Sequence, residues 1–146
     1  MKSSGRSRWH VDDGFDLDEF LLRPLIARVA TNGPTVRPVW YVWEEEALWW
    51  LTGGWSRLQT ILERDPRVAV SIDTSDLGTG IVLQVIAKGT AELEMFDPGR
   101  ARRWGARYLG PDERSWGRFG ESVFRDPSTR FVRLEPETLR ARDLSY

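Results

Sequence analysis

The chain has 146 residues, a formal net charge of −1 and no cysteine. This length suits one domain with a single core, and the near-neutral charge argues against a dedicated nucleic-acid binder. The missing thiols exclude disulfides and cysteine nucleophiles, and the single histidine, His10, excludes most zinc sites and Ser–His–Asp triads. With so few titratable catalytic groups, we expect any chemistry to come from a bound cofactor, and we expect no metal site.

The first residues of the chain have the composition of a flexible segment. Residues 1–15 are polar and interrupted by glycine, so we expect a flexible N-terminal arm ahead of one domain over residues 16–146. No apolar run is long enough to cross a bilayer, and the first residues lack the apolar stretch of a secretion signal. We therefore expect a cytoplasmic protein without a membrane partner.

The first half of the chain predicts a short helix and three strands. Asp16, with Glu19 three residues later, is a capping pattern, and Pro24 ends the helix that it starts. The stretch "LIARVAT" predicts a strand, "NGP" a turn, and "TVRPVWYVW" an extended segment. Pro38 places that segment at a sheet edge or a bulge. "ALWWLT" predicts a third strand, and apolar spacing predicts a helix over Ser56–Arg64.

The second half predicts more strands around one amphipathic helix. "RVAVSID" predicts a strand, and "GIVLQVIAKGTAELEMF" predicts one long strand or two that join at a bulge at Gly89. Asp97 caps the helix, and "RFVRL" and "ETLRARDLSY" predict closing strands. Because strands outnumber helices and follow one another in runs, the predicted fold class is mainly β (α+β), an antiparallel barrel of six to seven strands with flanking helices.

The stretch "TGGWSRLQTIL" joins the third strand to the next helix. Ser56 with Gln59 predicts a capping box, so the helix would begin at Ser56 with free backbone N–H groups pointing outward. Such a helix start attracts anions, and glycines allow a bound group to approach closely. Arg57 offers a guanidinium suited to phosphate, and Thr52 adds a hydroxyl. The stretch is therefore either a phosphate site or an ordinary turn with Arg57 in solvent.

Gln84 lies on a strand face that is otherwise apolar. It alternates in phase with Val82 and Ile86 within "IVLQVIAKG". A buried amide needs hydrogen-bond partners, because leaving it without them costs free energy. Those partners are either backbone groups or a ligand that lies on the barrel wall.

Four stretches resemble, in order and separation, the FMN-binding split barrels of the pyridoxamine 5′-phosphate oxidase-like family. They are "VRPVWYVW", "LTGGWSR", "RDPRVAVSI" and "LQVIAKGTAEL", with a weaker tail at "RFVRLEP", and they cover roughly residues 25–93. The resemblance implies a split β-barrel that forms a homodimer with the flavin between its subunits. The cofactor contacts that it implies are Arg37, Pro38, Val39, Trp40, Thr52, Ser56, Arg57 and Gln84.

The sequence also departs from the pattern of that family. Leu58 stands where a lysine usually adds a second cation for the phosphate, and the lysine and C-terminal Arg-x-His of the vitamin B6 oxidases are absent. Our hypothesis is a flavin- or deazaflavin-binding oxidoreductase that acts on a small substrate, with FMN or F420 as cofactor and no catalytic residue assigned. The alternatives are a non-catalytic ligand-binding split-barrel module, and a protein that binds haem or another planar ligand among its eight tryptophans.

Overall fold

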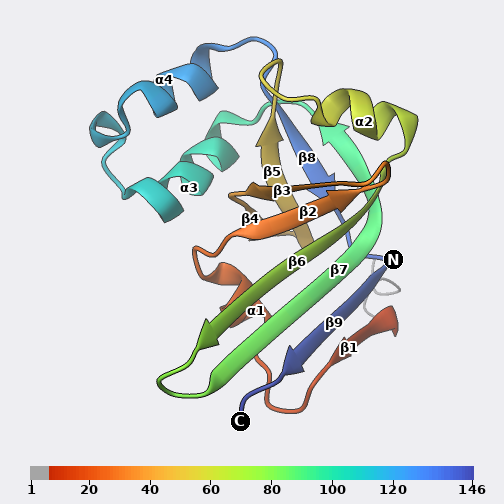
Figure 1. Cartoon of the computed structure of the whole chain (residues 1–146). Coiled ribbons are helices and arrows are strands. Elements are labelled where there is room, and N and C mark those ends of the chain that lie inside the picture. The colour runs from red at the N-terminus through yellow and green to blue at the C-terminus, as the bar shows by residue number, and fades with distance from the viewer. Residues whose placement is uncertain (1–6) are drawn as a thin grey trace.

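The structure, a computed structural model, describes residues 7–146. In this part of the chain, nine strands form one curled sheet in the order β3-β2-β6-β7-β8-β5-β4, with β9 beside β7 and β1 beside β9 (Figure 1). The β1–β9 pair is parallel and the others are antiparallel. The strands are β1 (Trp9–Val11), β2 (Ala27–Thr31), β3 (Thr35–Val39), β4 (Val42–Glu44), β5 (Ala47–Thr52), β6 (Arg67–Asp76), β7 (Ile81–Glu94), β8 (Arg130–Leu134) and β9 (Thr138–Asp143).

This sheet confirms the predicted fold class, a mainly β split-barrel-like fold with flanking helices. The strand count is nine instead of six or seven, because two three-residue strands, β1 and β4, carry too little sequence pattern to be recognised. The helices are α1 (Leu17–Leu22), α2 (Leu58–Arg64), α3 (Pro98–Leu109), a 3₁₀ turn (Glu113–Ser115) and α4 (Gly117–Arg125). Among the described helices, none has the length and apolar content needed to span a membrane.

Aspartate side chains begin two of these helices, as predicted. The Asp16 carboxylate accepts a hydrogen bond from the backbone N–H of Glu19 at 3.1 Å, and α1 follows. Asp97 accepts from the backbone N–H groups of Gly99 and Arg100 at 3.0 and 3.3 Å, and α3 follows. Each cap satisfies backbone donors that the first helical turn leaves free.

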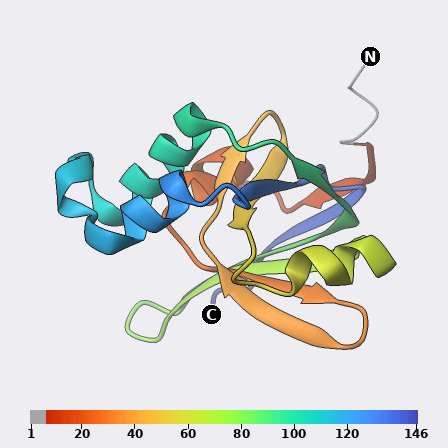
Figure 2. The ribbon, with the colours of Figure 1, turned by 90° about the horizontal axis from the view of Figure 1, so that it is seen from above.

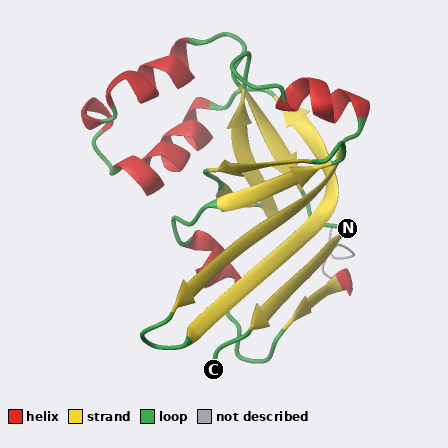
Figure 3. Cartoon of the chain, viewed as in Figure 1, coloured by secondary structure: helices red, strands yellow, loops and turns green. Residues whose placement is uncertain are grey.

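The chain crosses from one part of the curled sheet to another at residues 40–41. The segment that was predicted as one extended run is two strands, since β3 pairs with β2 and β4 pairs with β5 (Figure 3). Pro38 lies on β3 at the end of the strand order, so the predicted edge position is confirmed. The crossing leaves the last residues of β3 beside the helices that follow β7.

The long strand β7 does not contain the predicted bulge. Its register with β6 runs unbroken from Asp76↔Ile81 to Arg67↔Thr90. Gly89 instead marks the place where the other neighbour of β7 changes from β9 to β8. A Cβ on Gly89 would come within 3.1–3.2 Å of Leu134 and of the backbone at 135–137, so glycine allows this close approach.

Two apolar clusters hold the molecule together. The larger one fills the curl of the sheet and includes Phe20 from α1 and Leu58 from α2. The smaller one joins β4, β5 and β8 to α3 and α4 through residues such as Trp49, Trp104 and Phe131. Viewed from above, α3 and α4 lie together on one side of the sheet while α2 lies apart from them (Figure 2).

Part of the expected N-terminal arm belongs to the sheet. Within residues 1–15, the strand β1 pairs with β9 in the register Trp9↔Leu139 to Val11↔Ala141. The backbone N–H of Asp12 also donates to the carbonyl of Ala141 at 3.0 Å. Residues 1–6 lie outside the described residues, so the expectation of flexibility remains a prediction for them.

Glu44 connects the β4–β5 turn to α3. Its carboxylate accepts hydrogen bonds from Arg103 Nε at 2.6 Å and from Arg100 Nε at 3.0 Å. The hydrogen bonds to Arg103 and then Arg100 outweigh the effect of burial and lower the pKa of Glu44 below its ordinary value of 4.5. The Arg100 guanidinium also lies 3.5 Å from the centre of the Trp49 ring, so the pair is anchored to the smaller core.

We expect the Glu44→Gln variant to lose the contribution of this ion pair to stability. Because the folded pKa is lowered, that contribution is present above pH 4.5 and is lost as the pH falls through the folded pKa. The difference in free energy of unfolding between the wild type and the variant should therefore shrink between pH 6 and pH 3, measured by urea denaturation. Glu121→Gln, at an exposed glutamate of α4, is the control, and an identical pH dependence of all three proteins would contradict the assignment.

Candidate functional site

A hollow of about 940 Å³ opens between β3, β5, α2 and the α3–α4 pair, and we call it the β3–α2 groove. Its volume lies within the range of small-molecule sites in proteins. Six of the eight residues predicted to bind a cofactor line it: Arg37, Pro38, Val39, Trp40, Ser56 and Arg57. The other lining residues are Ile26, Arg28, Leu51, Trp55, Leu58, Trp104 and Phe119.

One end of the groove is polar because two segments meet there. Arg37 Nη1 on β3 donates a hydrogen bond to the hydroxyl of Ser56 at 2.9 Å. The same oxygen accepts from the backbone N–H of Leu58 at 3.1 Å, so Ser56 is fixed from two sides. The helix begins at Leu58 and its N-cap is Arg57, so the predicted helix start at Ser56 is two residues too early. The predicted capping box with Gln59 is wrong, because the Ser56 hydroxyl accepts from Leu58 instead. The Gly53–Ser56 turn, closed by a 3.0 Å backbone hydrogen bond, includes Ser56, the first residue of the predicted helix.

Two buried polar atoms, one on a residue that lines this end and one at the end of β5, have no hydrogen-bond partner among the described residues. They are Nε of Arg37 and the hydroxyl oxygen Oγ1 of Thr52. Thr52 is 1% exposed at the end of β5 and does not itself line the groove, although its neighbour Leu51 does. A buried polar atom without a partner costs about 1–3 kcal/mol. Of these two atoms only Arg37 Nε belongs to a residue that lines the groove, where a bound group can supply the missing bond.

The opposite end of the groove is aromatic. Trp40 stacks on Tyr108 with ring centres 4.6 Å apart and planes 4° apart, and it also contacts Trp104 and Phe119 at 5.6 and 5.2 Å. Trp104 Nε1 donates to the carbonyl of Trp40 at 2.9 Å. Sequence reasoning missed Trp55 and Phe119 as lining residues, although the high tryptophan content had suggested an aromatic slot.

Tyr108 has a structural position beneath this wall. Its hydroxyl donates to the carbonyl of Leu25 at 2.6 Å and accepts from the backbone N–H of Tyr41 at 3.1 Å. Burial raises the pKa of the Tyr108 phenol, so the hydroxyl keeps its proton and its donor role. Tyr108 therefore fixes the crossing at residues 40–41.

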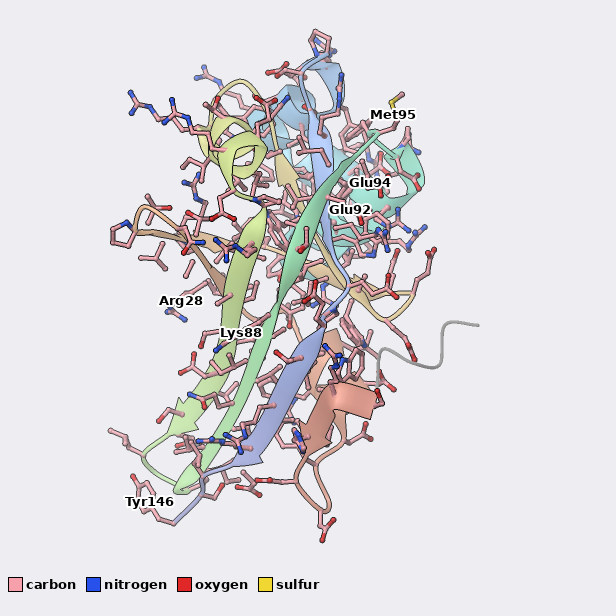
Figure 4. All side chains as sticks on the ribbon, turned by 90° about the vertical axis from the view of Figure 1, so that its right-hand side faces the viewer. Arg28, Lys88, Glu92, Glu94, Met95 and Tyr146 are labelled. Atoms are coloured by element: carbon pink, nitrogen blue, oxygen red, sulfur yellow. The ribbon has the colours of Figure 1, made fainter. Side chains whose placement is uncertain are left out.

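Gln84 lies apart from the groove. It lines a second hollow of about 700 Å³ on β1, β7 and β9, together with His10, Lys88, Arg140 and Arg142 among others. Figure 4 looks onto this face and labels Lys88. Within one chain, Gln84 and the β3–α2 groove share no lining residue, so the eight predicted residues do not form a single pocket. The only histidine of the chain also lies here, so no imidazole reaches the aromatic end of the groove.

A model of one protein family, described as pyridoxamine 5′-phosphate oxidase, matches residues 16–143. The chain belongs to this family. The match covers all strands of the sheet except β1 and includes both segments that form the polar end of the groove. No curated protein sequence matches the chain.

Solved structures share the fold of this pyridoxamine 5′-phosphate oxidase family member. A conserved hypothetical protein from Mycobacterium tuberculosis is 22% identical with a TM-score of 0.72, over 92% of this chain and 86% of that one. An F420 reductase is 22% identical with a TM-score of 0.63, over 88% and 98%. The haem storage protein HutZ from Vibrio cholerae is 18% identical with a TM-score of 0.64, over 84% and 89%. At these identities the likeness establishes the fold alone.

We expect Tyr108→Phe to lower the free energy of unfolding by about 1–3 kcal/mol, because it removes the partner of a backbone carbonyl at the half-buried Leu25 and of the backbone N–H at the buried Tyr41. The ring stays, so the stacking on Trp40 is retained and the change reports on the hydroxyl alone. Urea denaturation followed by circular dichroism measures the effect, with Tyr146→Phe, whose tyrosine is 81% exposed, as the control. Equal stability of both variants would show that the hydroxyl does not fix the crossing.

Proposed function

We propose that this protein is a flavin- or deazaflavin-binding oxidoreductase that acts on a small substrate. The observation that carries the proposal is the polar end of the β3–α2 groove, where Arg37 keeps a buried Nε without a partner in the described part of the chain. Family membership and a fold shared with an F420 reductase support the same conclusion. FMN and F420 both remain candidates.

The donors at the polar end suit a phosphate group. Arg37 donates one N–H, from Nη1, to the hydroxyl of Ser56. This bond holds the Arg37 guanidinium in place, while its Nε has no hydrogen-bond partner among the described residues. Arg57 lines the groove beside it and forms no ion pair with another described residue. A phosphate has oxygen acceptors for these guanidinium donors, and charge-assisted bonds of this kind are the stronger class.

The aromatic end of the groove suits the ring system of such a cofactor. A flavin or deazaflavin, when bound, supplies the hydride chemistry that this set of side chains lacks. The residues of the chain bind and orient the ring, since Trp40 is itself held by Tyr108 and Trp104. Among the described residues that line the groove, none is acidic and none is histidine, so we assign no proton donor.

A non-catalytic binding module is a second candidate, and Leu58 is the observation that favours it. Leu58 lines the polar end of the groove and is 1% exposed, at the position where a second phosphate cation was expected from the resemblance. Fewer cations weaken phosphate binding, and a protein with weak cofactor affinity would keep the fold without the reaction. An absorption spectrum of the purified protein with FMN and with F420 separates the two candidates.

We expect Arg57→Ala to weaken binding of the phosphate-bearing cofactor about tenfold or more, because a hydrogen bond to a charged group contributes about 1.5–3 kcal/mol. Titration with FMN and with F420, followed by absorbance or fluorescence, measures the dissociation constants. Arg64→Ala, at an exposed arginine near the other end of α2, is the matched control. Unchanged affinity in Arg57→Ala would reject this end of the groove as the phosphate site.

We further propose that the protein is a homodimer whose second copy covers the outer face of the sheet. No helix crosses in front of the lower halves of β6, β7 and β9 in Figure 4. Asp73, which pairs with Arg28 of the groove at 3.5 Å, lies opposite Gln84 in the β6–β7 register. The groove and the Gln84 hollow therefore lie on either side of β6, and a two-fold copy can bring a second Gln84 to the groove. Location in the cytoplasm stays a prediction from the sequence.

We expect Ile86→Glu, a charge placed at a half-buried position on the outer face of β7, to convert the dimer to monomers. Size-exclusion chromatography with light scattering gives the mass of each species. Leu22→Glu on α1, where the leucine is 58% exposed, tests whether any added charge has this effect. A monomeric wild type, or a dimeric Ile86→Glu variant, would overturn the proposed interface.

A further inference from the structure

We propose that the hollow between β5 and α4 binds a planar aromatic compound that carries a carboxylate, as the second ligand beside the cofactor. This inference rests on the proposed function, because it names the class of substrate that would meet the cofactor. The hollow measures about 460 Å³, which is enough for two fused rings with one substituent. Its lining residues are Leu51, Trp55, Trp104, Arg118, Phe119, Ser122 and Val123.

The hollow adjoins the β3–α2 groove. Four residues line both spaces, and they are Leu51, Trp55, Trp104 and Phe119. A ligand in the hollow would therefore border whatever occupies the aromatic end of the groove. Two adjoining spaces with shared walls are what a reaction between a bound cofactor and a separate substrate requires.

The exposed indole of Trp55 forms one aromatic wall of the hollow. It is 56% exposed, although a tryptophan on a turn would ordinarily bury more of its surface. Its ring lies against Gly53 so closely that a Cβ on Gly53 would overlap with the indole. The absence of a side chain on Gly53 thus permits this position of the Trp55 ring, and the exposed indole is accessible to a ligand.

Phe119 forms a second aromatic wall from α4. It is 43% exposed, and its ring stacks on Trp104 with centres 5.5 Å apart and planes 17° apart. Two large exposed aromatic side chains that line one hollow form an apolar patch of the kind that marks a binding site. Flat aromatic compounds fit these walls because ring pairs gain energy beyond the burial of apolar area.

Arg118 gives the hollow its charge. It lines the hollow next to Phe119 and forms no ion pair with another described residue. Among the described lining residues no carboxylate is present to neutralise it. An arginine fork binds a carboxylate through two parallel hydrogen bonds, so it selects an aromatic acid over the matching neutral compound.

The experiment compares 2-naphthoate with 2-naphthamide by isothermal titration calorimetry, with and without saturating FMN or F420. Ser122→Phe fills the hollow from an exposed position of α4, and Glu121→Phe places the same ring at the neighbouring exposed position, which lines a different hollow. We expect Ser122→Phe and Trp55→Ala each to weaken naphthoate binding at least tenfold, while Glu121→Phe matches the wild type. Arg118→Ala should remove the preference for naphthoate over naphthamide.

The outcomes separate this inference from the proposed function. Naphthoate binding that is weakened by Ser122→Phe and Trp55→Ala supports the ligand site between β5 and α4, whether or not a cofactor binds. Failure of both FMN and F420 to bind would count against the proposed cofactor only. Cofactor binding without naphthoate binding, or naphthoate affinity unaffected by Ser122→Phe, would overturn the ligand site. Equal affinity of the wild type for naphthoate and naphthamide would overturn the carboxylate.

Discussion

The stacked pair of Trp40 and Tyr108 ties together the parts of the molecule that build the groove. The chain leaves β3 and enters β4 at residues 40–41. The Tyr108 hydroxyl accepts a hydrogen bond from the backbone N–H of Tyr41 at this crossing and donates one to the carbonyl of Leu25, which precedes β2. Trp104 holds the carbonyl of Trp40 from the same helix, α3. Because α3 is also anchored to the β4–β5 turn through Glu44, a displacement of the helix would move the aromatic wall and the crossing together.

The polar end of the groove depends on a different constraint, the position of Arg37 on an edge strand. An arginine there can reach across to the turn after β5, and its bond to Ser56 joins two segments that are nineteen residues apart. That contact leaves Nε buried and without a partner among the described residues, and the hydroxyl of Thr52 at the end of β5 has no partner there either. A fold that only had to be stable would gain by satisfying these atoms within the chain. Their persistence is consistent with a site arranged for a bound group, where stability is given up for binding.

Local sequence predicted the elements better than it predicted where they meet. The Asp16 and Asp97 caps act within one helical turn, and alternating β-branched residues identify β6 and β7. Local sequence therefore predicted both helix starts and both strands. The crossing at residues 40–41 depends on Tyr108, which is more than sixty residues away, and no local pattern encodes it. Six of the predicted cofactor residues meet in one groove, whereas Gln84 faces another hollow because the strand β6 lies between them. Helix α2 starts late because Ser56 belongs to a turn whose bond to Gly53 competes with helical geometry.

The two spaces of the site are built from elements of different rigidity. The polar end of the groove is formed by β3, which backbone hydrogen bonds fix to β2, and by the turn after β5, which is closed by its own backbone hydrogen bond. The hollow between β5 and α4 is closed by α4, which contacts the sheet through side chains such as Val123 and Phe119. Backbone hydrogen bonds constrain position more tightly than apolar contacts, which tolerate exchange of residues of similar volume. Changes on α4 can therefore alter which ring compound is accepted without disturbing the groups that would hold a cofactor phosphate, and the same scaffold can serve different substrates.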